Sequence, residues 1–186
     1  MMPSVRTLAL AVGLLFVALA PARAADPENT LYLYVPAGRV VIELKPDLAP
    51  LTVAHIKELT RRGFYDGLAF HRVIEGFMAQ TGDPKGNGTG GSGKNVKAEF
   101  SQNAHFVRGT VGLARANDPD SGDSQFFICF RPAPGLDGKY TIFGQVTQGM
   151  EFIDAIKKGD PSKNGTVVGP DHIGRMQIAA DADKKG

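Results

Sequence analysis

Eight short runs rich in β-branched and aromatic residues constrain the fold of this chain more than any other feature. The first two, residues 30–35 and 38–45, flank a Pro-Ala-Gly turn and predict a β-hairpin. Glycine, proline or aspartate bounds most of the later runs, as is typical of short strands between turns. These later runs span residues 68–74, 76–82, 109–116, 124–130, 140–147 and 172–180.

Two segments have helical spacing instead. Residues 46–63 place apolar side chains near one helical face, with Pro50 suited to the first turn and Gly63 to the stop. Residues 149–160 predict a second helix. Strands and helices do not alternate regularly, which argues against a parallel sheet. We therefore expect a mainly β fold, a closed eight-stranded antiparallel β-barrel capped by two α-helices.

The first 24 residues have the pattern of a cleavable export signal. A basic start precedes the apolar run of residues 8–20, and Ala22 and Ala24 occupy the two positions that a signal peptidase reads. The run is short for a membrane span, although an uncleaved anchor or a buried helix is the alternative. We predict cleavage after Ala24, a periplasmic or secreted location, and a mature domain of residues 25–186 without stable membrane insertion.

Charge and cysteine content exclude several classes of function. The 21 lysines and arginines fall to 19 once Arg6 and Arg23 leave with the signal, which equals the 19 acidic residues. A neutral mature chain lacks the basic footprint of a nucleic-acid binder, so we expect no nucleic-acid partner. Cys129 is the only cysteine, so an internal disulfide is excluded. Its apolar neighbours predict a buried, unreactive side chain.

The glycine-rich residues 86–95 have part of the pattern of a phosphate-binding loop. Gly88, Gly93 and Lys94 match the spacing of G-x-x-x-x-G-K-[ST]. Such a loop requires a strand before it, a helix after it and a hydroxyl for magnesium. Here polar turn residues precede the stretch, no apolar helical stripe follows, and Asn95 replaces the hydroxyl. We therefore interpret it as irregular surface backbone with several positive φ angles.

No other familiar reaction centre is evident in the sequence. Residues 90–94 lack the last glycine of a nucleophile elbow. The acidic residues form no recognisable catalytic pair, and the four histidines have no metal-ligand spacing. We therefore predict neither a metal nor another cofactor. The histidines are His55, His71, His105 and His172.

Residues 70–83, "FHRVIEGFMAQTGD", resemble the signature of the cyclophilins, which are peptidyl-prolyl cis-trans isomerases. The resemblance covers residues 30–180. It implies an eight-stranded antiparallel barrel with a helix at each end, and rotation about X-Pro bonds without a cofactor or a covalent intermediate. It also identifies residues 86–95 with the Gly-rich surface loop of the family. Further matching segments follow in the family's order: "NGTGG" (87–91), "GTVGLARAN" (109–117), "DSQFFI" (123–128), "LDGKYTIFGQV" (136–146) and "GM" (149–150).

The resemblance assigns a catalytic role to Arg72, as the arginine that donates toward the prolyl nitrogen. A twisted amide nitrogen can accept a hydrogen bond, so a fixed cation beside it favours the transition state. His71 should point the other way and be structural. The implied substrate-binding residues are the proline-pocket residues Phe77, Met78, Phe127 and Leu136, the polar Gln80 and Gln125, the backbone-pairing Ala116 and Asn117, and Tyr140.

Three positions depart from the best-known members of the family. Glu75 replaces a common proline in a turn, and Tyr140 stands where many members have a histidine. Gly135 stands where many eukaryotic members have a tryptophan that helps to hold the inhibitor cyclosporin. Losing a large apolar ring and an N–H donor should weaken that contact. We therefore expect cyclosporin to bind this protein weakly.

Two classes of function follow from these patterns. The first is an active isomerase that acts on proline-containing peptides and unfolded exported proteins, because slow X-Pro steps limit their folding. The second is a binding module or holdase on the same fold. Arg72 favours the enzyme, since a pure binder would not need it. The sequence has no strong signal for oligomers, and we expect a monomer.

Overall fold

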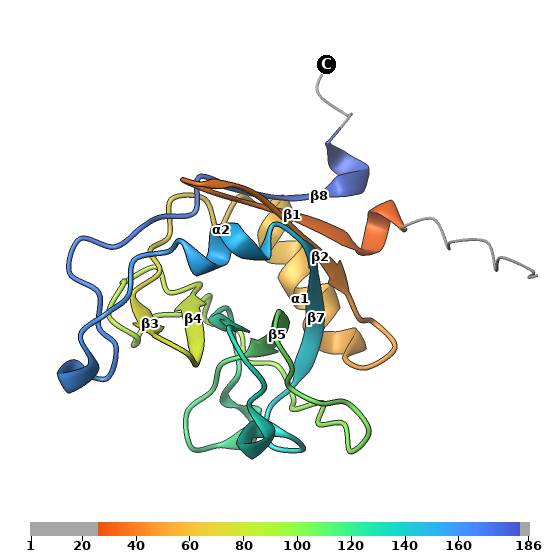
Figure 1. Cartoon of the computed structure of the whole chain (residues 1–186). Coiled ribbons are helices and arrows are strands. Elements are labelled where there is room, and N and C mark those ends of the chain that lie inside the picture. Colours follow the sequence, from red (N-terminus) through yellow and green to blue (C-terminus); the bar gives the residue numbers. More distant parts are fainter. Residues whose placement is uncertain (1–25, 183–186) are drawn as a thin grey trace, which may run out of the picture.

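The computed structural model describes residues 26–182 (Figure 1). The predicted signal of residues 1–24 therefore lies outside the described residues. No helix among the described residues is long and apolar enough to cross a membrane. The eight strands are β1 (Thr30–Val35), β2 (Gly38–Leu44), β3 (Arg72–Ile74), β4 (Met78–Thr81), β5 (Thr110–Leu113), β6 (Phe126–Cys129), β7 (Ile142–Gln148) and β8 (Arg175–Ile178).

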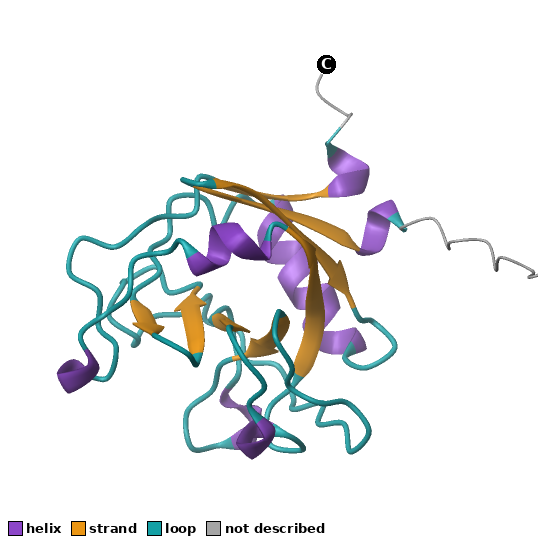
Figure 2. Cartoon of the chain, viewed as in Figure 1, coloured by secondary structure: helices purple, strands orange, loops and turns teal. Residues whose placement is uncertain are grey.

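Each strand coincides with one of the predicted runs, and every ladder between them is antiparallel. β1 and β2 form the predicted hairpin, in which Tyr34 pairs with Arg39. Short 3-10 turns interrupt the loops, as Figure 2 shows. They are η1 (Pro27–Asn29), η2 (Pro119–Ser121), η3 (Pro134–Leu136), η4 (Pro161–Lys163) and η5 (Ala179–Asp181).

The two predicted helices are α1 (Pro50–Arg61) and α2 (Met150–Asp154). α1 starts at Pro50 as expected, and Gly63 follows its end with a φ of 68°. The side chain of Ala49 cannot cap the helix, so the Glu99 carboxylate accepts hydrogen bonds from the N–H groups of Leu51 and Thr52 (2.9 and 2.8 Å). α1 packs against β8 and α2 against β2, and both helices appear within the outline of the curved sheet in the view of Figure 1.

The expectation of a closed barrel is wrong. The strands follow the order β3-β4-β6-β5-β7-β2-β1-β8, so β3 and β8 are edges of an open half-barrel. Irregular backbone spans the gap between them, with isolated bridges from Ala69 to His172 and from Arg72 to Thr166. Residues 157–174 contain two prolines, which lack an N–H, and several glycines in turns, so this segment cannot form a continuous ladder.

Two apolar clusters form on the two sides of β4 and β6. On β6, Phe126 and Ile128 belong to the main core, whereas Phe127 and Cys129 belong to a smaller second cluster with Met78. Successive side chains of a strand point to opposite faces, which explains the division. Cys129 is fully buried, as predicted, and burial raises the pKa of its thiol to about 12. The second cluster forms the floor of a surface hollow.

Candidate active site

A row of paired residues crosses the sheet beneath this hollow. Arg72 pairs with Gln80 across β3 and β4, Gln80 with Phe127 across β4 and β6, and Phe127 with Gly112 across β6 and β5. The strand register thus brings a cation, an amide and an aromatic ring side by side. Gly112 is required here, because a Cβ atom would lie 2.6 Å from the Phe127 ring and 2.7 Å from the Phe106 ring.

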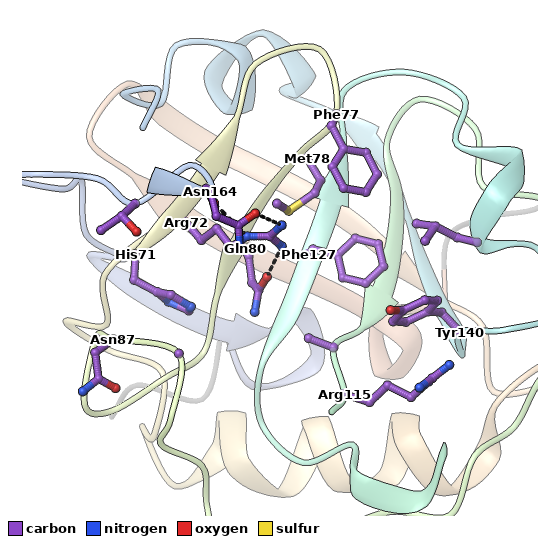
Figure 3. Close-up of a pocket in the computed structure, with 15 residues that line it drawn as sticks. His71, Arg72, Phe77, Met78, Gln80, Asn87, Arg115, Phe127, Tyr140 and Asn164 are labelled. Atoms are coloured by element: carbon purple, nitrogen blue, oxygen red, sulfur yellow. Dashed lines mark hydrogen bonds between the residues drawn. The ribbon is translucent and has the colours of Figure 1, made fainter. Parts of the chain in front are cut away.

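The hollow has a volume of about 480 Å³, with Arg72 on one side and an apolar wall on the other (Figure 3). Seven of the ten predicted site residues line it together. Their roles in binding and catalysis remain predictions, but the fold brings them to one place. They are Arg72, Phe77, Met78, Gln80, Phe127, Leu136 and Tyr140.

The Arg72 guanidinium is held by neutral oxygen atoms. Its Nε donates to the Asn164 carbonyl (3.0 Å), its Nη2 to Asn164 Oδ1 (2.9 Å) and its Nη1 to Gln80 Oε1 (3.1 Å). No carboxylate lies within ion-pair distance of Arg72 among residues 26–182. Burial lowers the pKa of Arg72, yet a guanidinium stays charged at neutral pH. Arg72 is therefore a fixed cation without a counter-ion on one side of the hollow.

A chain of amides connects Arg72 to the glycine-rich loop. Gln125 Nε2 donates to the carbonyls of Gly88 (3.1 Å) and Gly90 (2.8 Å), and Gln80 Nε2 donates to Gln125 Oε1 (2.9 Å). The carbonyls can only accept and the guanidinium can only donate, so the two ends of the chain fix the orientation of both amides. Gln80 must therefore present its oxygen to Arg72.

The loop itself is irregular, as expected, and Asp83 organises it. Its carboxylate accepts hydrogen bonds from the backbone N–H groups of Lys85 (2.8 Å), Asn87 (3.0 Å) and Gly88. Burial alone would raise the pKa of Asp83, but these hydrogen bonds together lower it below its usual value. Gly90 packs so closely that a Cβ atom would lie 2.1 Å from Asp83 Oδ1. Glycine at this position therefore allows the loop to pack against Asp83. No helix follows the loop before β5 in the described chain, so the helix of a phosphate-binding loop is absent there.

The opposite wall is a stack of rings. Phe106 stacks on Phe127 (5.7 Å between centroids), and Tyr140 contacts Phe127 edge-on (5.9 Å). The Arg115 guanidinium lies 4.5 Å from the centroid of Tyr140 and donates to the carbonyls of Lys139 and Ala116. Tyr140 is thus packed on one face by a cation and on its edge by a ring, which fixes it as a wall of the hollow.

The three remaining predicted residues lie outside this hollow. Gln125 and Ala116 line a second hollow of about 270 Å³, which shares Gln80 and Arg115 with the first. Asn117 is exposed and lines neither hollow. The backbone N–H of Ala116 donates to Ser121 Oγ (2.9 Å), so that group is already engaged.

His71 was expected to point away from the site, and that expectation is wrong. It is buried, lines the same hollow as Arg72, and is drawn with its ring toward Asn87 in Figure 3. Burial lowers its pKa, although Asp83 and the Ala69 carbonyl act in the opposite direction. His71 is therefore neutral at pH 7 and adds no charge to the wall.

Sequence reasoning also missed Asn164, Thr166 and Arg115, which line the hollow. Asn164 and Thr166 lie some 90 residues after Arg72 in a turn without sequence periodicity. The one local signal was the Asn164–Gly165 pair, because Asn and Gly are the residues that best tolerate positive φ. That signal predicts a turn but does not show what the turn contacts.

Comparisons with known proteins agree with this geometry. Residues 30–178 match the family described as "Cyclophilin type peptidyl-prolyl cis-trans isomerase/CLD". A probable peptidyl-prolyl cis-trans isomerase of Brucella suis is 52% identical over 185 residues, covering 93% of this chain and 92% of the relative. The peptidyl-prolyl cis-trans isomerase B of Bacillus subtilis is 45% identical over 139 residues, covering 74% of this chain and 96% of the relative.

Solved structures show the same fold. A cyclophilin from Hirschia baltica has a TM-score of 0.77 at 27% identity, covering 88% of this chain and 78% of that one. A cyclophilin-type isomerase from Cryptosporidium parvum, crystallised in the presence of the dipeptide Ala-Pro, has a TM-score of 0.73 at 28% identity. The match covers 80% of this chain and 98% of the parasite chain.

Proposed function

Because this chain belongs to the cyclophilin-type peptidyl-prolyl cis-trans isomerases, we propose that it uses Arg72 to catalyse X-Pro rotation in exported proteins. The isomerase activity and its independence of a cofactor follow from the family. The reaction breaks no bond, so it requires neither a nucleophile nor a metal. Proline-containing peptides are its substrates. The role of Arg72, the client proteins and the location are the parts that we propose.

Rotation about a peptide bond is opposed by amide resonance, with a barrier of about 18–20 kcal/mol. In the twisted transition state the prolyl nitrogen recovers its lone pair and becomes an acceptor. A donor placed there binds the transition state more tightly than either planar isomer. Guanidinium has five N–H donors, of which three make the bonds described above. One N–H on each Nη remains for the substrate.

The observation that supports this role is the missing counter-ion. An arginine that served only stability would gain from a carboxylate partner, whereas a bound carboxylate would cancel the field that stabilises the transition state. Arg72 instead has amide and carbonyl partners beside an apolar hollow. Phe77, Met78 and Phe127 give that hollow a surface suited to the proline ring.

Protease-coupled isomerisation of an Ala-Pro-Phe peptide by residues 25–186 tests the proposal. Arg72→Ala should lower kcat/KM at least about 100-fold. Peptide binding measured by NMR titration should survive in the variant, because the apolar hollow remains. Equal rates for the two proteins would remove Arg72 from the mechanism. A folded wild-type protein that binds the peptide without turning it over would favour the binding-module alternative.

The proposal of export rests on the leader pattern of residues 1–24. Cleavage after Ala24 would release a domain that assists the folding of other exported proteins, where slow X-Pro isomerisation delays the native state. Expression of the full chain in a Gram-negative host tests this. We expect the protein in the periplasmic fraction with Ala25 at its N-terminus. A cytoplasmic protein that retains Met1 would contradict the proposal.

A further inference from the structure

Asn164 contacts the Arg72 guanidinium twice, and no other residue does so among those described. Its backbone carbonyl accepts from Nε (3.0 Å), and its side-chain Oδ1 accepts from Nη2 (2.9 Å). Gln80 binds Nη1 on the other side. Figure 3 shows the guanidinium between these two residues. Two bonds to the same residue restrain rotation about the last bonds of the long Arg72 side chain.

The backbone of Asn164 is unusual. It is the single non-glycine residue with positive φ in residues 26–182, at φ 54° and ψ 33°. It follows η4 and precedes Gly165, which has a φ of 79°. Most L residues are strained in this left-handed conformation, and asparagine is among the few that tolerate it. The conformation directs both oxygens of Asn164 toward the same guanidinium.

The turn that carries Asn164 is fixed to β3 by other groups. The Val73 N–H donates to the Gly165 carbonyl (2.8 Å), and the Gly159 N–H donates to the Val73 carbonyl (2.9 Å). Within the turn the Gly165 N–H donates to the Asp160 carbonyl (2.8 Å), and the Asp160 side chain accepts from the Ser162 N–H (2.9 Å). None of these bonds uses the Asn164 side chain. That side chain is therefore free to serve Arg72 alone.

We propose that Asn164 is a positioning residue that sets the direction of the Arg72 guanidinium without reducing its charge. The inference rests on the catalytic role proposed above for Arg72. A carboxylate at this position would hold the side chain equally well but would form an ion pair with it. The neutral oxygens of Asn164 orient the cation and leave its field available to the twisted amide.

Asn164→Gly tests the positioning role with little strain, because glycine accepts positive φ and keeps the backbone carbonyl. We expect kcat, measured by NMR exchange spectroscopy at saturating peptide, to fall roughly tenfold. KM should stay within about twofold, because the apolar hollow is untouched. The Nη2 N–H signals of Arg72 should exchange faster with water, because the variant loses Asn164 Oδ1 while the backbone carbonyl still binds Nε. A merely structural role would not produce this change.

Asn164→Asp tests the requirement for a neutral partner. The variant keeps an oxygen at the same place and tolerates the same φ. The Nη2 N–H signals of Arg72 should therefore exchange as slowly as in wild type while kcat falls by a similar factor, since the guanidinium gains a counter-ion. Unchanged kcat in Asn164→Asp would refute the neutrality argument even if Asn164→Gly behaved as expected.

Asp160→Ala is the matched control, because it loosens the same turn without touching Arg72. Its thermal midpoint should fall, and its kcat should stay within about twofold of wild type. Equal losses of kcat in Asp160→Ala and Asn164→Gly would reduce Asn164 to a structural role and overturn the inference. Arg72→Ala in the same assay separates the two proposals. If it abolishes turnover while Asn164→Gly is fully active, the proposed function stands and the positioning role fails.

Discussion

At the scale of single residues, the chemistry of this site depends on which groups are left unpaired. Arg72 has neutral partners and two free N–H donors, whereas Arg61 and Arg108 elsewhere on the chain are paired with carboxylates. The signature in residues 70–83 predicts a catalytic role for Arg72. It could not predict Asn164, because the contact depends on a turn some 90 residues later that the fold brings to the edge of β3.

Gly135 gives a prediction at the same scale. It lies in η3 beside Leu136, and a Cβ atom built there meets nothing within 4 Å. A Cβ atom at position 135 therefore meets no steric obstacle. We expect weak cyclosporin binding by the wild-type protein and an affinity at least about tenfold higher in Gly135→Trp, since an aromatic ring and an N–H donor are added beside the hollow. Isothermal titration calorimetry measures both.

Lys97→Trp is the control, because it adds the same ring at an exposed position that does not line the hollow. It should not change the affinity. A nanomolar dissociation constant for the wild-type protein would show that Gly135 is not what limits cyclosporin binding.

At the scale of elements, the glycine-rich loop is a structural support for the strands that carry Arg72 and Gln80. Backbone N–H groups of the loop donate hydrogen bonds to the Asp83 carboxylate. Two carbonyls of the loop accept hydrogen bonds from Gln125. Gln125 is hydrogen-bonded to Gln80, which in turn is hydrogen-bonded to Arg72. The sequence predicted the irregular backbone and the positive φ angles. The direction in which the carbonyls point is a tertiary property, and it gives the loop its effect on the site.

We expect Asp83→Asn to destabilise the protein by about 2 kcal/mol at pH 7, because an amide NH₂ replaces one of the two accepting oxygens. The pKa of Asp83 is lowered in the folded state, so its stabilising effect is complete above the unfolded value of about 3.9 and is lost as pH falls through the folded value. Wild type should therefore lose stability more steeply than the variant below about pH 4. Urea unfolding at several pH values measures this.

Asp47→Asn serves as a control, because it makes the same change of side chain at an exposed position. Its free energy of unfolding should match wild type at every pH. Identical pH dependence of wild type and Asp83→Asn would exclude the loop carboxylate as a source of acid sensitivity.

At the scale of the whole molecule, the sheet is an open half-barrel whose edges are protected by other parts of the chain. α1 packs against β8, and the backbone of residues 165–173 bonds to that of residues 67–73 beside β3. Exposed edge strands invite aggregation, and such covers prevent it without a closing ladder. The turn with Asn164 lies at this open side, where it contacts Arg72.

Amide hydrogen exchange should distinguish the hydrogen-bonded strands from the irregular backbone that spans the gap between β3 and β8. The central amides of β2, paired on both sides by β1 and β7, should exchange only through global unfolding. Amides of residues 157–174 should exchange at least about tenfold faster, since irregular backbone opens locally. Equal exchange rates in β2 and in residues 157–174 would contradict this prediction. They would indicate that the irregular backbone resists local opening as well as paired strands do.

The sequence by itself determined the local structure. β-rich runs bounded by glycine and proline located all eight strands, and Pro50 and Gly63 delimited α1. Short matching segments in residues 70–83, 123–128 and 136–146 named seven residues that line the hollow. These features depend on neighbours a few residues apart. The tertiary structure decided that the sheet stays open, that His71 lines the hollow and that Asn164 holds Arg72. Those outcomes depend on contacts between segments far apart in the chain, for which strand and helix periodicity carries no information.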